Sequence, residues 1–140
     1  MAATAPRSEL LVIVGETASG KSALASNLAK EFHGEIIAAD SWTVYKGFDI
    51  GTSKPTAEDR QRVSHHLIDV ADPLSGFNAP KFKELAETAI ADIQNRGKLP
   101  IMVGGTGLYI DSVLFDFGFL PNASAQERQK LDPMGLADLL

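Results

Sequence analysis

The chain has 140 residues and a formal net charge of −5 at pH 7, with 44% hydrophobic and 22% charged residues. This length and balance predict about one globular domain with an ordinary hydrophobic core. No apolar run reaches the roughly 18 residues of a transmembrane helix. The chain has no cysteine, which excludes disulfides, thiolate metal sites and cysteine nucleophiles. The acidic balance argues against a large nucleic-acid footprint on this part of the protein. These features fit a cytoplasmic protein with no membrane association.

Three regions are predicted along the chain. Residues 1–9 lack the apolar core of a secretory signal and are expected to form a disordered tail. Residues 10–121 alternate between strand and helix patterns and should form the core, whereas residues 122–140 resemble the start of a helical region. That pattern stops on Leu139 and Leu140 without an evident partner for their side chains. We therefore expect a fragment or truncated form of a longer protein, whose exposed apolar surface could cause self-association.

The first predicted strand, Leu10–Val14, leads into the sequence Gly-x-x-x-x-Gly-Lys-Ser, and a helical pattern follows. This motif between a strand and a helix is the phosphate-binding loop, and the flanks argue against a mere glycine turn. Glycines let backbone N–H groups turn inward around an anion, and the helix N-terminus adds a positive dipole end. Lys21 would reach the terminal phosphate oxygens, and Ser22 is placed to bind Mg²⁺. The predicted binding residues are Gly15, Glu16, Thr17, Ala18, Ser19, Gly20, Lys21 and Ser22.

The helix after this loop is expected over about residues 19–32. Its apolar face is predicted at Leu24, Leu28 and Phe32, which recur at four-residue spacing. Gly34 is suited to the left-handed position that ends such a helix.

Strands and helices alternate through the rest of the core. Thr56 and Asn78 are expected to cap the helices that follow them. The other predicted elements are strands over residues 35–41, 65–70 and 99–106, and helices over residues 79–96 and 107–114. A strand, a crossover helix and a second strand favour a parallel pair. The sequence therefore predicts a three-layer α/β fold with a doubly wound, mostly parallel sheet, similar to the P-loop NTPases.

Polar residues follow the predicted strands, at the edge where a doubly wound sheet binds its ligands. Asp40 could bind Mg²⁺, act as a general base, or simply cap the next turn; the neighbouring phosphate loop favours a functional role. The run Gly104-Gly105-Thr106 could let the backbone approach a ligand, with Thr106 hydrogen-bonding to it. It could equally be a bare turn with an N-cap threonine.

Two further groups are candidates with open roles. His65 and His66 are adjacent in a predicted strand, so they face opposite ways and cannot easily share a zinc ion. One of them could still face the crevice. Trp42 and Tyr45 lie just past Asp40, where an aromatic ring could stack on a base or an isoprenoid chain, or pack under a loop.

Together these motifs resemble the tRNA dimethylallyltransferases (tRNA isopentenyltransferases), from about Leu11 to Leu120. In chain order the motifs are Gly-x-Thr-Ala-Ser-Gly-Lys-Ser, Ile-Ile-x-Ala-Asp-Ser-x-x-Val-Tyr-Lys-Gly, Asp-Ile-Gly-Thr-x-Lys-Pro-Thr, His-His-Leu-Ile-Asp and Val-Gly-Gly-Thr-Gly-Leu-Tyr. The resemblance implies transfer of a dimethylallyl group from dimethylallyl diphosphate to the exocyclic amine of an adenine beside the tRNA anticodon. Pyrophosphate leaves, so the loop would hold a diphosphate. A monomer is implied for the full-length protein.

The resemblance also implies roles for individual residues. Lys21 and Ser22, with Mg²⁺ as cofactor, would neutralise the charge that grows on the leaving group. Asp40 matches the family's catalytic base. The adenine would be flipped into a channel, and the residues that match the family's tRNA contacts are Asp40, Ser41, Trp42, Thr43 and Thr106.

Two departures from the family pattern stand out. Glu16 replaces the proline usual after the first glycine, which places a negative charge beside an anion site. Family members are also about twice as long, and the part beyond this chain carries much of the helical tRNA-binding region and a later arginine that contacts diphosphate.

Other functions remain compatible with the residues. Prenyl transfer to a free adenine nucleotide is one alternative. A nucleotide or small-molecule kinase is another, because the loop, Ser22 and Asp40 would serve ATP and phosphoryl transfer equally well. A phosphate-binding fragment without chemistry is a third.

Overall fold

The computed structural model describes residues 9–121 together with residues 126, 129, 130 and 133. The tail predicted for residues 1–9 and the helical region predicted for residues 122–140 fall almost entirely outside these residues. Among the helices that are described, none is both long and apolar enough to cross a membrane.

The core is a four-stranded sheet in the order β1-β4-β2-β3, and every neighbouring pair is parallel. Residue pairs Val12–Met102, Ile36–Ile101 and Ile37–His66 set its register. The strands are β1 (Leu11–Val14), β2 (Gly34–Ala38), β3 (His65–His66) and β4 (Leu99–Gly104). The helices are α1 (Lys21–Glu31), α2 (Ala57–Arg62), α3 (Ala79–Asn95) and α4 (Gly107–Leu114).

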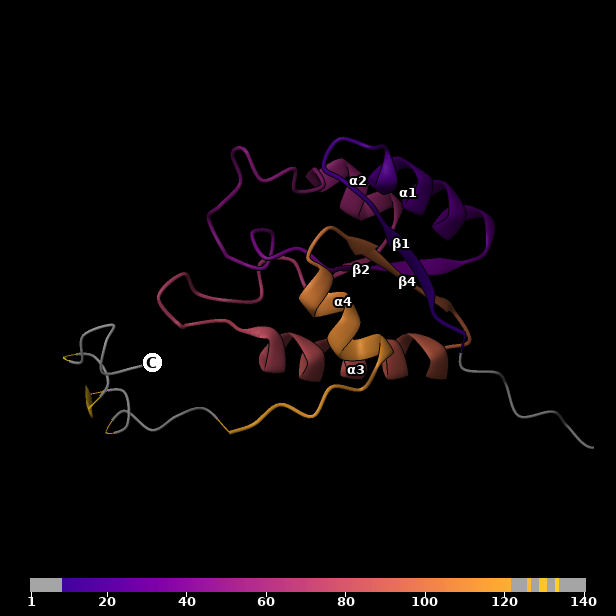
Figure 1. The fold of residues 1–140 in the computed structure, drawn as a ribbon. Coiled ribbons are helices and arrows are strands. Elements are labelled where there is room, and N and C mark those ends of the chain that lie inside the picture. The colour runs from indigo at the N-terminus through magenta and orange to yellow at the C-terminus, as the bar shows by residue number, and fades with distance from the viewer. Residues whose placement is uncertain (1–8, 122–125, 127–128, 131–132, 134–140) are drawn as a thin grey trace, which may run out of the picture.

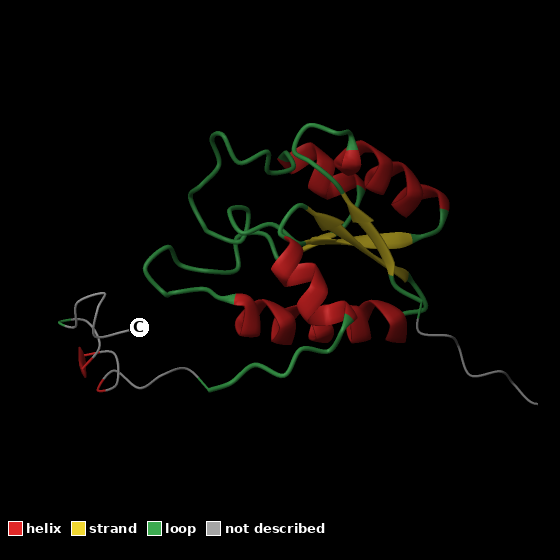
Figure 2. Cartoon of the chain, viewed as in Figure 1, coloured by secondary structure: helices red, strands yellow, loops and turns green. Residues whose placement is uncertain are grey.

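Helices cover both faces of the sheet, with α1 and α2 on one side and α3 and α4 on the other (Figures 1 and 2). On the α3 side, Phe82 and Ile93 are fully buried against Ile37 and Met102 of the sheet. On the α1 side, Ile36 and Ile101 pack with small residues of the helix. These two apolar layers confirm the predicted three-layer, doubly wound α/β fold.

The predicted apolar face of α1 is wrong. Ala25 and Ala29 are the buried residues of the helix, whereas Leu24 is 51% and Phe32 55% exposed. Small side chains let the helix lie close to β2 and β4, and only Leu28 of the predicted face packs against that core. Spacing alone could not distinguish the two faces, because both recur every four residues.

The prediction for Gly34 is also wrong. His33 takes the left-handed position after α1, with φ +52°, and Gly34 begins β2. A Cβ on Gly34 would lie 2.8 Å from the Leu99 carbonyl oxygen, so glycine is needed there for the approach of two strands. The predicted third strand is shortened to two residues because Leu67 and Asp69 adopt positive φ angles.

Both predicted N-caps are confirmed. The Thr56 hydroxyl accepts a hydrogen bond from the Asp59 N–H, and the Asp59 side chain accepts one from the Thr56 N–H, a reciprocal capping box. The Asn78 side chain accepts from the Lys81 N–H at 3.0 Å. The predicted bounds of the last helix, 107–114, match α4.

Candidate active site

The loop of residues 15–22 connects β1 to α1 in a sharply turned conformation. Gly20 has φ +88° and directly precedes the first residue of α1. Ala18 also has a positive φ, +62°, which costs an L-residue energy and is typical of binding loops. The glycine positions are visible in the sequence, whereas the strained Ala18 is not.

Lys21 lies across this loop. Its ammonium donates hydrogen bonds to the Glu16 carbonyl oxygen and to the Ser19 hydroxyl, the latter at 3.4 Å. Ser19 itself donates to the same Glu16 carbonyl at 2.7 Å. The Glu16 side chain is exposed, so its carboxylate is not part of this network. The arrangement places a cation at the N-terminus of α1, where an anion is favoured.

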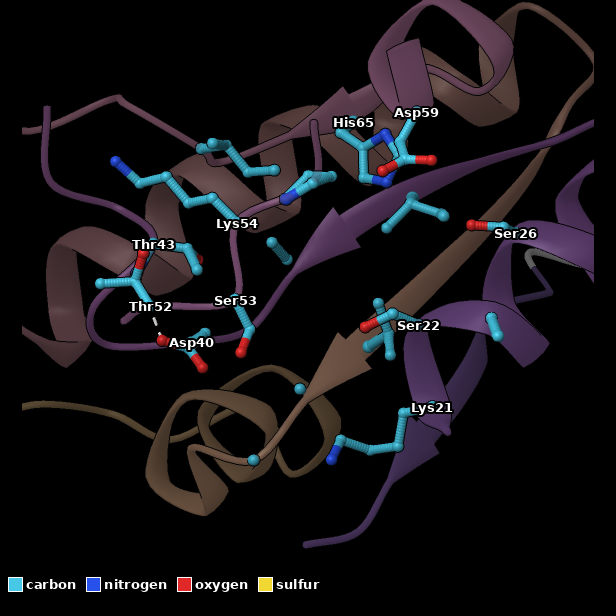
Figure 3. Close-up of a pocket in the computed structure, with 18 of the residues that line it drawn as sticks. Lys21, Ser22, Ser26, Asp40, Thr43, Thr52, Ser53, Lys54, Asp59 and His65 are labelled. Atoms are coloured by element: carbon cyan, nitrogen blue, oxygen red, sulfur yellow. Dashed lines mark hydrogen bonds between the residues drawn. The ribbon is translucent and has the colours of Figure 1, made fainter. Parts of the chain in front are cut away.

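A cavity of about 470 Å³ opens from this loop along the α1 face of the sheet (Figure 3). Four of the predicted phosphate-binding residues line it, namely Thr17, Ala18, Lys21 and Ser22; the other four belong to the loop but not to the lining. Its other walls come from α1, the ends of β2 and β4, and two segments between β2 and β3. Those walls include Ser26, Asn27, Ile36, Ala38, Asp40, Thr43, Thr52, Ser53, Lys54, Pro55, Asp59, His65, Val103 and Gly104.

Asp40 lies two residues past the end of β2 and faces this cavity. Its Oδ1 accepts hydrogen bonds from the Trp42 N–H at 2.7 Å and the Thr43 N–H at 3.2 Å. The carboxylate therefore caps its own turn and lines the cavity at once. Within the described part of the chain, Oδ2 makes no hydrogen bond, which leaves it available to a ligand.

Thr106 joins the ends of β4 and β2. Its hydroxyl accepts a hydrogen bond from the Ser41 N–H at 3.0 Å and makes no cap bond to α4. Gly104 is also explained by the chain itself, because a Cβ there would lie 2.0 Å from the Ala39 carbonyl oxygen. The approach of two strand ends accounts for Gly104, while Gly104 and Gly105 also line the cavity and Thr106 is the N-cap residue of α4, so both interpretations of this run remain open.

Thr43 has an unusual environment. It is 6% exposed, it lines the cavity, and its hydroxyl has no hydrogen-bond partner among the described residues. A buried hydroxyl without a partner is costly, so this group is a candidate for contact with a ligand.

The two aromatic candidates pack against other rings. Trp42 is 60% exposed and lies near Phe48, with ring centroids 6.3 Å apart. Tyr45 contacts Phe48 and Phe77. Neither ring lines the cavity. Of the five predicted tRNA contacts, the structure brings Asp40 and Thr43 into the cavity and binds Ser41 to Thr106 beside it.

The two adjacent histidines face opposite ways, as predicted. His65 lines the cavity, and its Nδ1 lies 2.7 Å from the Val63 carbonyl oxygen, so Nδ1 carries the proton and donates it. Burial lowers the pKa of His65, although the bond to Val63 opposes this. His66 Nε2 instead contacts Glu35 on the other face of the sheet at 2.7 Å.

Lys54 was not among the site residues predicted from the sequence. It lines the cavity with a side chain that is only 4% exposed. Its partners, Asp49 and Asp69, come from two of the motifs quoted above. The available signal was that Lys54 itself stands in the Asp-Ile-Gly-Thr-x-Lys-Pro-Thr motif that carried part of the resemblance.

A cavity with a glycine-rich loop at the carboxyl edge of a parallel sheet is typical of phosphate-binding α/β proteins. The comparisons with known proteins go further. Residues 43–139 match the family model "IPP transferase", and the chain belongs to this family.

Similar proteins agree with this assignment. The chain is 47% identical over 130 residues to a Staphylococcus epidermidis protein named tRNA dimethylallyltransferase, covering 93% of this chain and 39% of that one. A Geobacter metallireducens protein of the same name is 58% identical over 104 residues, 74% of this chain and 34% of that one. The chain therefore spans about two fifths or less of these relatives.

Solved structures show the same fold. The tRNA isopentenylpyrophosphate transferase from Bacillus halodurans matches with a TM-score of 0.79 at 45% identity, over 90% of this chain and 42% of that one. A eukaryotic dimethylallyltransferase described as acting on tRNA matches with a TM-score of 0.80 at 31% identity, over 93% of this chain and 33% of that one.

Proposed function

We propose that this chain binds dimethylallyl diphosphate and transfers its dimethylallyl group to the exocyclic amine of an adenine in tRNA, beside the anticodon. The observation that carries this function is the single cavity that holds both the loop cation Lys21 and the carboxylate Asp40. The names of its relatives, tRNA dimethylallyltransferases, supply the substrates. The diphosphate would lie in the loop of residues 15–22.

In this reaction the adenine nitrogen forms a bond to the allylic carbon while the bond from that carbon to the diphosphate oxygen breaks. Negative charge grows on the departing pyrophosphate. The Lys21 ammonium and the N–H groups at the start of α1 stabilise it there, where charge develops in the transition state. The amine proton passes to the Asp40 carboxylate, acting as general base.

Magnesium is the cofactor that these residues fit. The Ser22 hydroxyl lines the same cavity as Lys21 and offers the kind of oxygen ligand that Mg²⁺ prefers beside phosphates. When bound, the ion would add positive charge against the leaving group.

The Thr43 hydroxyl would supply one polar contact to the adenine. It lies three residues from Asp40, and its backbone N–H already holds that carboxylate. An adenine bound beside Asp40 would therefore lie close to the Thr43 hydroxyl, which has no partner among the described residues. Recognition of a flipped base by such contacts is common among enzymes that modify nucleotides. Ser41, Trp42 and Thr106 are proposed to contact the tRNA around this point.

The cellular setting follows from the same substrates. We propose that the protein acts in the cytoplasm, where its tRNA substrate would be found, and that a full-length form is a monomer.

Two alternative functions share this geometry. Transfer to a free adenine nucleotide would use the same loop and the same base. A kinase would place ATP in the loop, with Asp40 activating an acceptor.

A transfer assay separates the three functions. Dimethylallyl diphosphate labelled in the prenyl group is incubated with the chain, Mg²⁺, and either tRNA or AMP, and the Staphylococcus epidermidis relative serves as positive control. We expect label in tRNA and none in AMP. Label in AMP alone would establish the nucleotide prenyltransferase instead. Phosphoryl transfer from ATP to AMP, without prenyl transfer, would establish a kinase.

A further inference from the structure

Two motifs of the chain have no role in the chemistry described so far. One is Asp-Ile-Gly-Thr-x-Lys-Pro-Thr, over residues 49–56, and the other is His-His-Leu-Ile-Asp, over residues 65–69. In the structure the two are joined directly. The Lys54 ammonium of the first lies 2.6 Å from Asp69 Oδ1 of the second.

Lys54 is held on three sides. Besides Asp69, it donates to the Tyr45 carbonyl oxygen at 2.6 Å and to Asp49 Oδ1 at 2.9 Å. Asp69 in turn accepts from Arg60 at 2.9 Å through its other oxygen. Burial lowers the pKa of Lys54, but its hydrogen bonds to Asp69 and Asp49 raise it by more, so the group stays charged.

The charges of this cluster are balanced. Lys54 and Arg60 contribute two positive charges, and Asp49 and Asp69 contribute two negative charges. The cluster therefore presents little net field to an anion in the cavity, although Lys54 lines it. This distinguishes Lys54 from Lys21, whose described contacts are a carbonyl and a hydroxyl oxygen and include no carboxylate.

A chain of hydrogen bonds leads from this cluster to the proposed base. The Asp69 N–H donates to the Thr43 carbonyl oxygen at 3.1 Å, and the Thr43 N–H donates to Asp40 Oδ1. The Ala71 N–H likewise donates to the Val44 carbonyl oxygen. Asp69 has φ +56°, a conformation that persists only when neighbouring contacts hold it.

The segment that Lys54 holds has few other contacts. Between Lys46 and α2 the chain has no regular structure, and Ile50 is 96% exposed. Gly47, Gly51 and Ser53 all have positive φ angles. The same segment brings Thr52, Ser53 and Pro55 to the cavity wall. Because this segment has few packing contacts, its conformation depends on its hydrogen bonds and ion pairs.

We propose that Lys54 is a positioning residue. Paired with Asp69, its ammonium fixes the wall formed by residues 43–55 and thereby sets where Asp40 and Thr43 meet the acceptor. This role rests on the proposed function, since the wall meets an adenine only if adenine is the acceptor. Lys54 makes no contribution of its own to binding of the diphosphate.

The test compares Lys54→Met and Asp69→Asn with the wild type in the complete 140-residue chain. Lys30→Met is the matched control, because Lys30 is an exposed lysine on α1 that does not line the cavity. Three properties are measured with Mg²⁺ present: affinity for pyrophosphate by calorimetry, affinity for an RNA anticodon stem-loop carrying the target adenine, and hydrogen exchange of the amides of residues 41–53.

In both variants we expect pyrophosphate affinity to stay within about twofold, while RNA affinity falls about tenfold and exchange over residues 41–53 accelerates about tenfold. Lys30→Met should change none of these. Equal losses of pyrophosphate and RNA affinity would overturn the proposal, because Lys54 would then bind the anion or support the whole fold. Unchanged exchange over residues 41–53 would overturn it as well.

Failure of the proposed function gives a different result. A wild-type chain that binds pyrophosphate but not the RNA would contradict the proposed acceptor. The exchange rates would still decide whether Lys54 holds the wall.

Discussion

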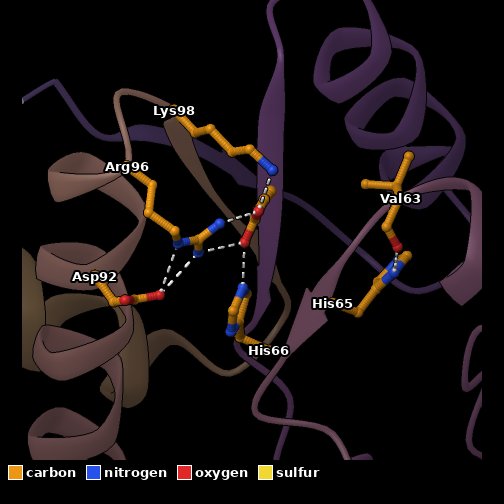
Figure 4. Close-up of polar contacts among 7 residues, drawn as sticks. Val63, His65, His66, Asp92, Arg96 and Lys98 are labelled. Atoms are coloured by element: carbon orange, nitrogen blue, oxygen red, sulfur yellow. Dashed lines mark hydrogen bonds and ion pairs between the residues drawn. The ribbon is translucent and has the colours of Figure 1, made fainter.

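Two carboxylates at opposite ends of β2 have contrasting environments. Glu35, near the start of the strand, is 3% exposed and accepts hydrogen bonds from Arg96, Lys98 and His66. Figure 4 shows these three side chains converging on one point from different elements. Asp40, just past the end of the strand, is bound on one oxygen only, by backbone N–H groups of its own turn.

The electrostatics of Glu35 follow from its partners. Hydrogen bonds, that from Arg96 foremost, hold the pKa of Glu35 well below its ordinary value of 4.5, against the opposing effect of burial. The same pair raises the pKa of Arg96. A carboxylate with all its acceptor sites occupied does not take up a proton near neutral pH, so we expect Glu35 to have a structural role.

The two ends of β2 differ in how their polar groups are paired. At the amino end of the strand, charges are paired with one another. At the carboxyl end, the Thr43 hydroxyl and one Asp40 oxygen have no partner within the described residues, and a cavity adjoins both. We therefore expect substitutions at the first end to change stability, and substitutions at the second to change ligand binding.

The largest effect is expected for Lys21→Ala. Removing the loop cation should weaken pyrophosphate binding about 100-fold, equivalent to about 3 kcal/mol, because charge-assisted hydrogen bonds to the anion are lost. Calorimetry measures the affinity, and urea unfolding should show a change within about 0.5 kcal/mol, as for an ordinary surface residue. A Lys21→Ala variant that is less stable but binds pyrophosphate as tightly as the wild type would contradict the expected role of Lys21 in binding.

Glu35→Gln should show the opposite behaviour. The amide cannot pair with Arg96 and Lys98, so the free energy of unfolding should fall by about 3 kcal/mol. Urea unfolding measures this loss. Pyrophosphate affinity of the folded variant should match the wild type; a clear drop in affinity would show that the two ends of β2 are coupled.

The pH dependence of stability should report on the same residue. The pKa of Glu35 is lowered on folding, so its contribution is fully present above the unfolded value of 4.5 and is lost as the pH falls below it. The free energy of unfolding should therefore fall more steeply between pH 6 and pH 3 in the wild type than in Glu35→Gln. Equal slopes would mean that other carboxylates dominate acid unfolding.

The smallest overall effect is expected for Thr43→Val. A methyl group replaces a buried hydroxyl that has no partner among the described residues, so stability should be unchanged or rise by up to about 1 kcal/mol. Affinity for the anticodon stem-loop RNA should fall several-fold. Thr43→Ser is the control, because it keeps the hydroxyl. A stability loss of more than 1 kcal/mol on Thr43→Val would show a structural hydrogen bond instead.

Much of the fold was predictable because it rests on local patterns. Short stretches of sequence are enough to predict the alternating strands and helices, the caps at Thr56 and Asn78, and the glycine loop. The buried face of α1 was not predictable from such a pattern. Ala25 and Ala29 are buried because small side chains let the helix lie close to the sheet, not because they are the most hydrophobic residues of the helix.

The long-range ion pairs were not predictable either. Glu35 pairs with Arg96 and Lys98, more than sixty residues away, and Lys54 pairs with Asp69 through a left-handed turn. No periodicity links such positions in one sequence. Lys54 and Asp69 each stand in a motif that carried the resemblance, but neither motif indicated that the two side chains pair.

We propose above that the loop of residues 15–22 holds the diphosphate of a prenyl donor. The most direct test is calorimetric titration of the chain with dimethylallyl diphosphate and, separately, with ATP, both with Mg²⁺ and with Lys21→Ala as control. We expect dimethylallyl diphosphate to bind more tightly than ATP and to lose its affinity in Lys21→Ala. Tighter binding of ATP, lost in the same variant, would contradict the claim and favour a kinase.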